Sequence, residues 1–319
     1  MAPVTDARTI LVTGGTGLLG NAIRAVARDV PGARFVFVGS RDCDLTRLDA
    51  TIELVRAHAP DAILHTAALA GGIQFSTDHP ATLLRDNVLM NLHIVEAARL
   101  AGVRKTVMTL STGMYPEHAP LPLREEYIHD GPPHPSNYGY SFAKRLIEPT
   151  IRAYRREYGM CLIGLVANGI FGEHGNFRVG ESVMLAALVR RFFEQRHLTN
   201  DIVVAGDGSP FREYTYCQDL ARAFLWCLEH YDDERTLHVG STEEHTVKET
   251  AYMIADILGI DPRRIVFDAS KPGGILRKNT DNSRFLELSG FAFTPFREAL
   301  ERTVAWFCAN YDTPGAVKL

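Results

Sequence analysis

The sequence lacks the features of secreted proteins, of proteins stabilised by a structural metal ion, and of membrane-spanning proteins. Its five cysteines are scattered over 319 residues, with no Cys-x-x-Cys pair. An odd number without close spacing argues against a disulfide framework or a structural zinc site and favours a reducing compartment. No apolar run approaches the roughly 18 residues of a membrane span, and the first residues carry no basic segment followed by an apolar one. We therefore expect no metal, no signal peptide, no membrane partner and a cytoplasmic location.

A surplus of either charge is also absent. Lys and Arg number 34 against 38 Asp and Glu, so the net charge is −4. A basic surplus would indicate nucleic acid or an anionic membrane surface as a partner, and this balance favours neither. The length permits one large domain or two modest ones around a substantial core.

Apolar runs typical of strands alternate with segments of helical spacing in the first half. This alternation predicts an α/β fold of the Rossmann type, a doubly wound parallel sheet with right-handed crossovers. The strand-like runs are 9–12, 34–38, 62–67, 106–111 and 162–166, and the helical segments are 18–29, 48–58, 80–101 and 138–158.

After residue 170 the pattern loosens. Residues 1–170 with about 206–232 are predicted to form the Rossmann domain, and about 171–205 with 233–319 a smaller, non-contiguous mixed α/β domain over the carboxyl edge of the sheet. The predicted elements of this half are helices at 181–195, 218–229, 247–258 and 295–309 and a strand at 202–205.

Residues 13–20 (TGGTGLLG) form a glycine-rich segment between a strand-like run and a helical one. Gly14 would allow the tight turn, Gly17 the approach of a pyrophosphate to the backbone, and Gly20 close packing of helix on strand. Free N–H groups and the dipole at a helix N-terminus favour phosphates. A glycine pattern alone can be only a loop, but this context favours a dinucleotide site.

The end of the second strand indicates which dinucleotide binds. An NAD enzyme usually has an acidic residue there for the ribose hydroxyls, whereas Ser40 and Arg41 come first in this chain. Arginine can hold a 2′-phosphate in a bidentate pair, so we expect NADPH as the cofactor. Asp42 and Asp44 are expected near the adenine or capping the segment at Thr46. The alternative is that Arg41 is a plain surface charge in a turn.

Tyr140 and Lys144 stand four residues apart in a helical segment, so they share one face. The ordinary pKa of a phenol is about 10, and a lysine ammonium one turn away would lower this pKa and make the phenol a better proton donor. Such a pair suits proton transfer at a ketone or alcohol oxygen while hydride moves at carbon. Alone the pattern is weak, since surface pairs of this kind are common.

Ser111 ends the apolar run 106–111, at the rim where open α/β sheets bind ligands. A serine there could simply cap a loop, but beside a Tyr/Lys pair it is better read as a second hydrogen-bond donor to the substrate oxygen. Ser111, Tyr140 and Lys144, with the Gly-x-x-Gly-x-x-Gly spacing, resemble the catalytic set of the extended short-chain dehydrogenase/reductase (NAD-dependent epimerase/dehydratase) family. The resemblance implies cofactor contacts at Gly14, Thr16, Gly17, Leu18, Leu19, Ser40, Arg41, Asp44, Leu45, Ala67, Ala68, Tyr140 and Lys144.

Further stretches are similar to the GDP-L-fucose synthases, which convert a GDP-4-keto-6-deoxy sugar with NADPH. They are 131–137, 171–177, 206–213, 270–274 and 277–278, spread over nearly the whole chain. The resemblance implies a GDP-linked 4-keto sugar as substrate, with Arg212 near its diphosphate. Isolated arginines, however, are more often solvated charges than ligands. The implied substrate contacts are Thr112, Gly113, Asn168, Asn176, Val183, Arg191, Arg212 and Lys271.

The chain departs from this family at the residues that invert C3 and C5 of the sugar. Inversion needs two positioned acid/base groups, which in the family are a cysteine and a histidine. The aligned positions hold Gly113 and Val183, and neither side chain can carry a proton. His174 is nearby in sequence but matches another family position. The family's loop asparagine is also displaced, because Gly169 takes its place and Asn168 precedes it.

We therefore expect a C4 reductase of a GDP-4-keto sugar without epimerase activity. The alternatives are a bifunctional epimerase/reductase that uses other bases and a non-catalytic NADP-binding protein. The resemblance also implies a homodimer formed through the helix at 80–101 and the Tyr/Lys helix. Apolar residues on the helix at 80–101 agree with this, although core burial could account for all of them.

Overall fold

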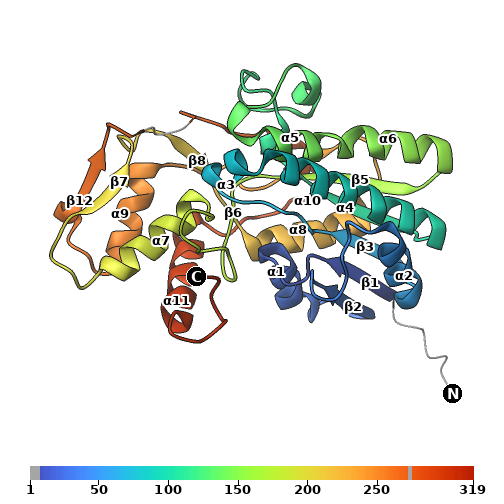
Figure 1. The fold of residues 1–319 in the computed structure, drawn as a ribbon, viewed down its shortest axis with the longest axis horizontal. Coiled ribbons are helices and arrows are strands. Elements are labelled where there is room, and N and C mark those ends of the chain that lie inside the picture. Colours follow the sequence, from blue (N-terminus) through green and yellow to red (C-terminus); the bar gives the residue numbers. More distant parts are fainter. Residues whose placement is uncertain (1–7, 272–274) are drawn as a thin grey trace.

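A six-stranded parallel sheet forms the centre of the molecule (Figure 1). The structure is a computed structural model that describes residues 8–271 and 275–319. Its strand order is β2-β1-β3-β4-β5-β10, and the chain reverses direction across the sheet between β1 and β3. This arrangement confirms the predicted doubly wound α/β fold and creates a crevice at the carboxyl ends of β1 and β3. The strands are β1 Arg8–Thr13, β2 Ala33–Val38, β3 Ala62–His65, β4 Lys105–Ser111, β5 Cys161–Ala167 and β10 Leu237–Val239.

Helices cover both faces of the sheet, so its strands are buried on both sides. Along β1, Ile10 and Val12 join the hydrophobic cluster on one face and Leu11 joins the cluster on the other. The first face carries α1 Leu18–Ala27 and α8 Cys217–His230, and the second carries α2 Leu48–His58, α4 Pro80–Ala101, α5 Tyr138–Arg145 and α6 Ile147–Tyr158 (Figure 1).

The single helix predicted at 138–158 is two helices. α5 ends at Arg145 and α6 begins at Ile147. Pro149, in the first turn of α6, has no N–H to donate to the Arg145 carbonyl, and its ring crowds that carbonyl. The break therefore separates the segment with Tyr140 and Lys144 from the remainder of the predicted helix.

The second half of the chain adds short strand pairs and helices beyond the carboxyl edge of the sheet. The pairs are β6 Ile170–Phe171 with β9 Thr215–Tyr216, β8 Phe211–Glu213 with β11 Glu244–Thr246, and β7 Ile202–Ala205 with β12 Ile265–Asp268. The helices are α7 Met184–Gln195, α9 Val247–Ile257, α10 Ser283–Ser289 and α11 Phe296–Asn310, while the short α3 Ile73–Asp78 follows β3.

One segment lies outside the region predicted for it. β10 belongs to the range assigned to the smaller domain, but it pairs with β5 as the edge strand of the central sheet. Three residues of strand carry too weak a periodicity to reveal this partner. The remaining division into domains stays a prediction.

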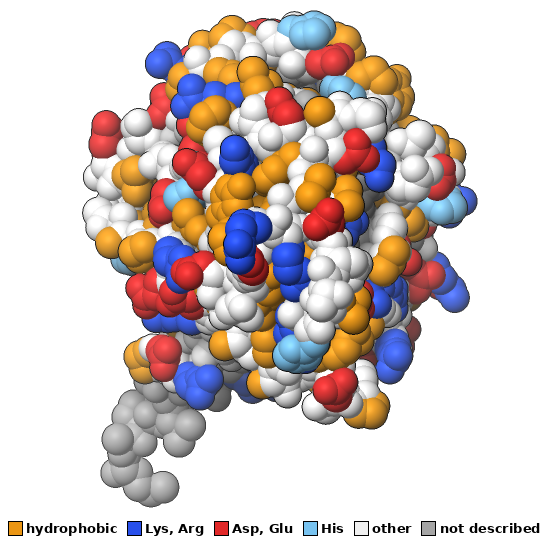
Figure 2. All heavy atoms as spheres, turned by 90° about the vertical axis from the view of Figure 1, so that its left-hand side faces the viewer, with side chains coloured by type: hydrophobic (Ala, Val, Ile, Leu, Met, Phe, Trp, Pro, Cys, Tyr) orange, Lys and Arg blue, Asp and Glu red, His pale blue; other side chains and the backbone are white. Residues whose placement is uncertain are grey.

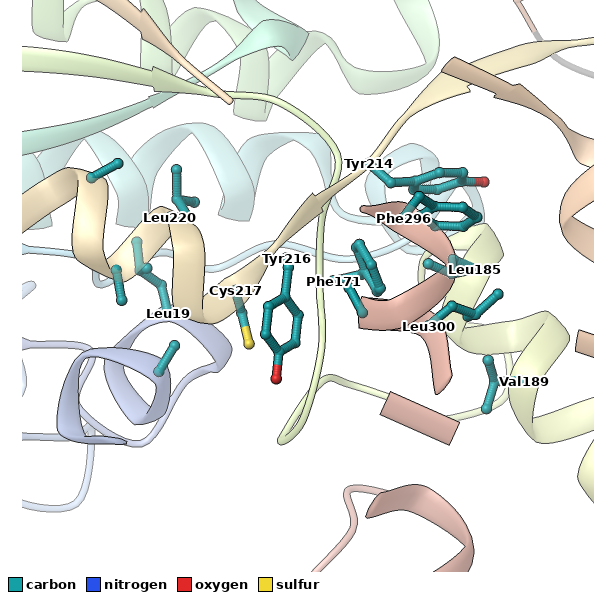
Figure 3. Packing of buried hydrophobic residues seen from close by; sticks show 14 of the residues in the cluster. Leu19, Phe171, Leu185, Val189, Tyr214, Tyr216, Cys217, Leu220, Phe296 and Leu300 are labelled. Atoms are coloured by element: carbon teal, nitrogen blue, oxygen red, sulfur yellow. The ribbon is translucent and has the colours of Figure 1, made fainter. Parts of the chain in front are cut away.

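An apolar cluster continues from the sheet into the second half of the chain. Tyr214 stacks on Phe296 with ring centroids 4.7 Å apart, and Phe171 packs edge-on against both (Figure 3). Cys217 and Leu19 extend the same cluster toward α1. This packing holds the smaller region against the Rossmann core.

The surface carries charges of both signs. On the face formed by the second half of the chain, acidic and basic side chains are interspersed (Figure 2). No helix among the described residues is long and apolar enough to cross a membrane. Of the stretch 270–274, residues 272–274 lie outside the described residues.

Candidate active site

The glycine-rich segment forms a cradle that side chains would fill. Gly14 has φ +73°, and a Cβ there would stand 2.6 Å from the backbone nitrogen of Ala67. A Cβ on Gly20 would stand 2.3 Å from the Gly14 carbonyl oxygen. The turn and the close packing of helix on strand, which the sequence predicted at these positions, are both present. Ala67 forms the opposite wall, and Ala68 beside it is exposed.

The N-terminus of α1 fits the phosphates of a dinucleotide. Gly17 is the N-cap in extended conformation, and the first turn (Leu18, Leu19, Gly20) carries no acidic side chain. The free N–H groups of this turn therefore face no competing carboxylate of their own helix. Thr16 lies against the end of β2, since a Cβ on Gly39 would be 2.8 Å from its side chain.

The acidic residues after β2 are held in turns. Asp42 accepts a hydrogen bond from the backbone N–H of Gly39 at 2.8 Å, and Asp44 accepts from the backbone and hydroxyl of Thr46. Ser40 and Arg41 are exposed. Within residues 8–271 and 275–319, Arg41 makes no side-chain hydrogen bond or ion pair. Its guanidinium thus remains able to bind a 2′-phosphate.

Leu45, predicted among the cofactor contacts, has a buried side chain. Its backbone carbonyl accepts a hydrogen bond from Nδ1 of His93 on α4 at 3.0 Å. Any contact with the cofactor would have to use the backbone.

Ser111, Tyr140 and Lys144 meet where β4 ends against α5. Ser111 Oγ accepts a hydrogen bond from the backbone N–H of Gly113 at 3.2 Å, at the start of a 3₁₀ turn over Thr112–Met114. This contact fixes the serine side chain and leaves its hydroxyl proton to donate. Tyr140 is a further hydrogen-bonding partner of Ser111.

Lys144 is almost completely buried, with 1% of its surface exposed. Its Nζ donates to the Thr109 carbonyl oxygen at 2.8 Å and lies 5.9 Å from the centre of the Tyr140 ring. Burial lowers the pKa of Lys144 to about 8, because the charged form loses its hydration.

The predicted lowering of the Tyr140 pKa is wrong for this structure. Burial raises the pKa of Tyr140, and the hydrogen bond with Ser111 opposes the rise without overcoming it. Desolvation of the phenolate outweighs the attraction of an ammonium that is directed at the Thr109 carbonyl. The phenol is therefore firmly protonated at neutral pH.

The sequence did not predict a role for His65, a buried histidine close to Lys144. His65, at the end of β3, lies 2.7 Å from Thr13 Oγ1 and 3.1 Å from Asn91 Oδ1 through its two ring nitrogens. Burial, and next the charge of Lys144, lower the pKa of His65 to about 3, so the ring stays neutral. It ties β1, β3 and α4 together beneath the site. The one sequence feature that could have indicated this role is the presence of a histidine within the apolar strand-like run 62–67.

Two basic residues come from β8 and from the segment that pairs with it, where the Phe211 N–H donates to the Leu276 carbonyl oxygen. Arg212 donates to the carbonyl oxygens of Phe211 and Ile275 at 2.6 and 2.8 Å. Lys278 lies close enough that the charge of Arg212 adds to burial in lowering the Lys278 pKa to about 8. Two neighbouring cations suit a diphosphate. The sequence predicted Arg212 as a substrate contact, whereas Lys278 was named only within the family-like stretch 277–278.

Two other predicted basic contacts are engaged elsewhere. Arg191 on α7 donates to the Val203 carbonyl oxygen at 2.7 Å. Lys271 forms an ion pair with Asp268 at 3.5 Å, at the end of β12. Both are exposed, so their role toward a substrate stays a prediction.

Comparisons with known proteins agree with this geometry. The family model described as NAD dependent epimerase/dehydratase matches residues 10–240. The GDP-L-fucose synthase of Dictyostelium discoideum is 32% identical over 98% of this chain and 99% of its own length. The crystal structure of a GDP-L-fucose synthetase from Naegleria fowleri bound to NADP has a TM-score of 0.91 at 33% identity, covering 99% of this chain and 98% of its own.

The chain belongs to the NAD dependent epimerase/dehydratase family. The predicted enzyme class, an NADPH-dependent oxidoreductase acting on a nucleotide sugar, and the predicted cofactor are thereby confirmed. The fold is also that of a GDP-mannoheptose C4 reductase from Campylobacter jejuni, with a TM-score of 0.86 at 22% identity over 96% of this chain and 100% of its own.

Within this family fold, Gly113 borders a small polar niche. A Cβ on Gly113 would lie 3.3 Å from Asn137 Nδ2, 3.5 Å from Ser111 Oγ and 3.6 Å from Ser141 Oγ. Asn137 Oδ1 and Ser141 Oγ are buried and find no partner among the described residues. Neither Asn137 nor Ser141 was singled out from the sequence. The niche offers hydrogen bonds and no group with the acidity of a thiol.

Asn168 does not hold the role predicted for it. Its Nδ2 donates to Glu213, Ser241 and Thr280 at 2.7–3.1 Å, and its Oδ1 accepts from the Thr215 hydroxyl. All the hydrogen bonds of this amide are therefore made within a buried network, and none is left for a substrate.

At Gly169, where the resemblance places the family's loop asparagine, the structure leaves no room for a side chain. A Cβ on Gly169 would stand 1.8 Å from the Glu213 carbonyl oxygen. No side chain fits there, because β8 approaches too closely.

The remaining candidates lie on the loop between β6 and α7. Val183 is the N-cap residue of α7 and is 54% exposed. Asn176 accepts a hydrogen bond from the Arg178 N–H at 3.1 Å. His174, with φ +65°, packs its ring on Trp306 of α11 at 4.7 Å between centroids. It lines a cavity of about 200 Å³ together with residues of α1, α8 and α11, on the face of the sheet opposite Tyr140.

Proposed function

We propose that this protein is an NADPH-dependent C4 reductase of a GDP-linked 4-keto sugar without C3/C5 epimerase activity. The observation that carries the proposal is Gly113. It stands between Ser111, Asn137 and Ser141 and places no ionisable group where the fucose synthases have a cysteine. At the second epimerase position, Val183 is apolar.

The side chains of the site suit reduction. NADPH supplies the hydride that the ketone carbon accepts. Tyr140, protonated at neutral pH, gives its proton to the developing alkoxide oxygen, and Ser111 donates a hydrogen bond to the same oxygen. Lys144 would hold the ribose of the bound cofactor. Positioning and oxyanion stabilisation carry the rate.

The substrate class rests on the cation pair and on the relatives. Arg212 and Lys278 lie together near the end of β8 and would bind the diphosphate of the nucleotide sugar. Relatives that are 32% and 34% identical over nearly the whole chain are named GDP-L-fucose synthase and probable GDP-L-fucose synthase, which supports a GDP sugar.

A bifunctional epimerase/reductase is the second candidate, and the names of these relatives favour it. It would need bases other than Gly113 and Val183. His174 is the first suspect, but its ring packs on Trp306 with α1 and α8 as neighbours. A non-catalytic NADP-binding protein is the third candidate. The intact Ser111, Tyr140 and Lys144 argue against it, because a sensor needs no proton donor, and oxidation of NADPH on adding a 4-keto GDP sugar would exclude it.

Solvent exchange separates reduction from epimerisation. The protein is incubated with GDP-4-keto-6-deoxymannose in D₂O with NADP⁺ and without NADPH, so that reduction cannot trap the sugar. We expect no protein-dependent deuterium gain at C3 or C5, whereas a GDP-L-fucose synthase treated in parallel should label both carbons. Catalysed exchange at either carbon would contradict the proposal. Binding of the sugar is measured on the same sample, so that lack of exchange is not mistaken for lack of binding.

Two substitutions extend the test. Gly113→Cys should restore exchange at one carbon, because one base suffices to remove a proton. Full inversion should also require Val183→His, since the opposite face must be protonated.

A further inference from the structure

Residues 316–319 reach back from α11 to the loop that follows β6. The Val317 side chain is 7% exposed and belongs to the main hydrophobic cluster. The Phe177 N–H donates to the Lys318 carbonyl oxygen at 3.0 Å, and Asn176 pairs with Lys318 in an isolated parallel bridge. This tail is therefore fastened to the structure by backbone and by core contacts.

The side chain of Lys318 crosses from this tail to the glycine-rich segment. Its Nζ donates to the Thr16 carbonyl oxygen at 3.0 Å, although 302 positions separate the two residues. Thr16 immediately precedes Gly17, the N-cap of α1, and its side chain lies against Gly39 at the end of β2. The ammonium therefore lies beside Thr16, between the N-terminus of α1 and the end of β2, the two places expected to bind phosphates of the cofactor.

Among the residues that the structure describes, no carboxylate pairs with the charge of Lys318. Within the described ranges no carboxylate lies within 4.0 Å of its Nζ. Lys318 is an exposed residue, but partial burial of its ammonium lowers its pKa, and the charge of Arg178 lowers it further. A cation that lies beside another cation and is partly removed from water is stabilised when an anion binds there.

We propose that Lys318 is a cofactor-binding residue that donates to a phosphate of NADPH while it remains bonded to Thr16. An ammonium has three donors, so one can stay on the carbonyl while another meets a phosphate oxygen. The tail would then close the cofactor site from the side of the smaller domain. This inference rests on NADPH as the cofactor and is independent of the sugar.

Binding of the reduced cofactor to the intact protein tests the inference without any sugar. NADPH and NADH are titrated by fluorescence against wild type, Lys318→Met, Lys318→Arg and, as a control, Lys248→Met on the exposed surface of α9. We expect Lys318→Met to raise the Kd for NADPH by roughly tenfold, the usual size for a hydrogen bond to a charged group. We expect Lys318→Arg to stay near wild type and Lys248→Met to match it.

The two cofactors distinguish the two phosphate groups. Equal losses for NADPH and NADH would assign Lys318 to the pyrophosphate, and a loss for NADPH alone would assign it to the 2′-phosphate. In either case the Kd of Lys318→Met should depend less on salt than that of wild type, since one ionic contact is gone. The inference is overturned if Lys318→Met binds both cofactors within about twofold of wild type. It is also overturned if Lys318→Arg loses affinity as Lys318→Met does and the Kd of Lys318→Met depends on salt as strongly as that of wild type. The side chain would then act only through packing.

Discussion

At the scale of single residues, burial acts on Tyr140 and Lys144 in opposite directions. It raises the pKa of the phenol and lowers that of the ammonium to about 8. Both groups are therefore protonated at neutral pH. Proton donation to a ketone oxygen needs a protonated phenol, so these charges are compatible with reduction.

Tyr140→Phe should cut turnover by roughly 10² to 10⁴ and leave NADPH binding nearly intact, because it removes only the general acid. Steady-state kinetics and a fluorescence titration of NADPH measure the two quantities. Tyr138→Phe is the matched control, since Tyr138 is 52% exposed one position before Gly139. Near-normal turnover in Tyr140→Phe would remove this residue from its role.

The pKa of Lys144 predicts a pH dependence. Below about pH 8 the ammonium is charged, and above it the charge is lost in the folded protein. We expect kcat/KM for NADPH, which reports the free enzyme, to be level near neutral pH and to fall above about pH 8. A profile that stays level to pH 10 would contradict the assignment.

The same shift affects stability in the opposite sense. Between about pH 8 and the ordinary value of 10.5, the unfolded chain binds more protons at this residue than the folded one. The contribution of Lys144 to the free energy of unfolding therefore rises with pH over this interval. Lys144→Met should remove this rise, and denaturant unfolding at pH 8 and pH 10 measures it.

At the scale of elements, the loop between β5 and β6 is fixed by its contact with β8. Asn168 is bonded to Glu213, and Gly169 lies against the backbone of that residue. Gly113, in the turn after β4, has more room, since a Cβ there would meet only side-chain atoms at 3.3 Å or more.

Gly169→Ala should therefore lower the free energy of unfolding by about 3 kcal/mol or more, whereas Gly113→Ala should change it by less than about 1 kcal/mol. Urea unfolding of both variants provides the comparison. Equal stabilities would mean that β8 can withdraw from Gly169. In that case the displaced asparagine would have no steric cause.

At the scale of the whole molecule, an apolar surface remains along α4, α5 and α6. Leu92, Leu100 and Leu146 are 39%, 42% and 47% exposed. Leu83 and Val95, by contrast, are buried in the core. The apolar face predicted on the helix at 80–101 thus divides between the core and the surface, and the exposed part suits a second copy of the chain.

We predict a homodimer through this surface. Light scattering at micromolar concentration should give twice the mass of the chain. Leu92→Glu combined with Leu146→Glu should give a monomer of unchanged circular dichroism. Leu198, 51% exposed in the loop between α7 and β7, provides the control, and Leu198→Glu should remain dimeric. A monomeric wild type would end the proposal.

The sequence by itself determined five of the six strands of the sheet, the glycine-rich turn and the Ser111, Tyr140 and Lys144 set. These features rest on short-range patterns: apolar periodicity, glycine spacing, and side chains one helical turn apart. The bounds of α2 and α4 agree with the predicted ranges, because both helices begin and end where the local pattern changes.

Only the tertiary structure decided the rest. The direction of the Tyr140 pKa depends on burial and on where Lys144 directs its ammonium. The network of Asn168, the crowding at Gly169 and the contact of Lys318 with Thr16 join residues from 44 to 302 positions apart. Such contacts arise from the packing of strands and loops against one another, and no local periodicity in the sequence encodes them.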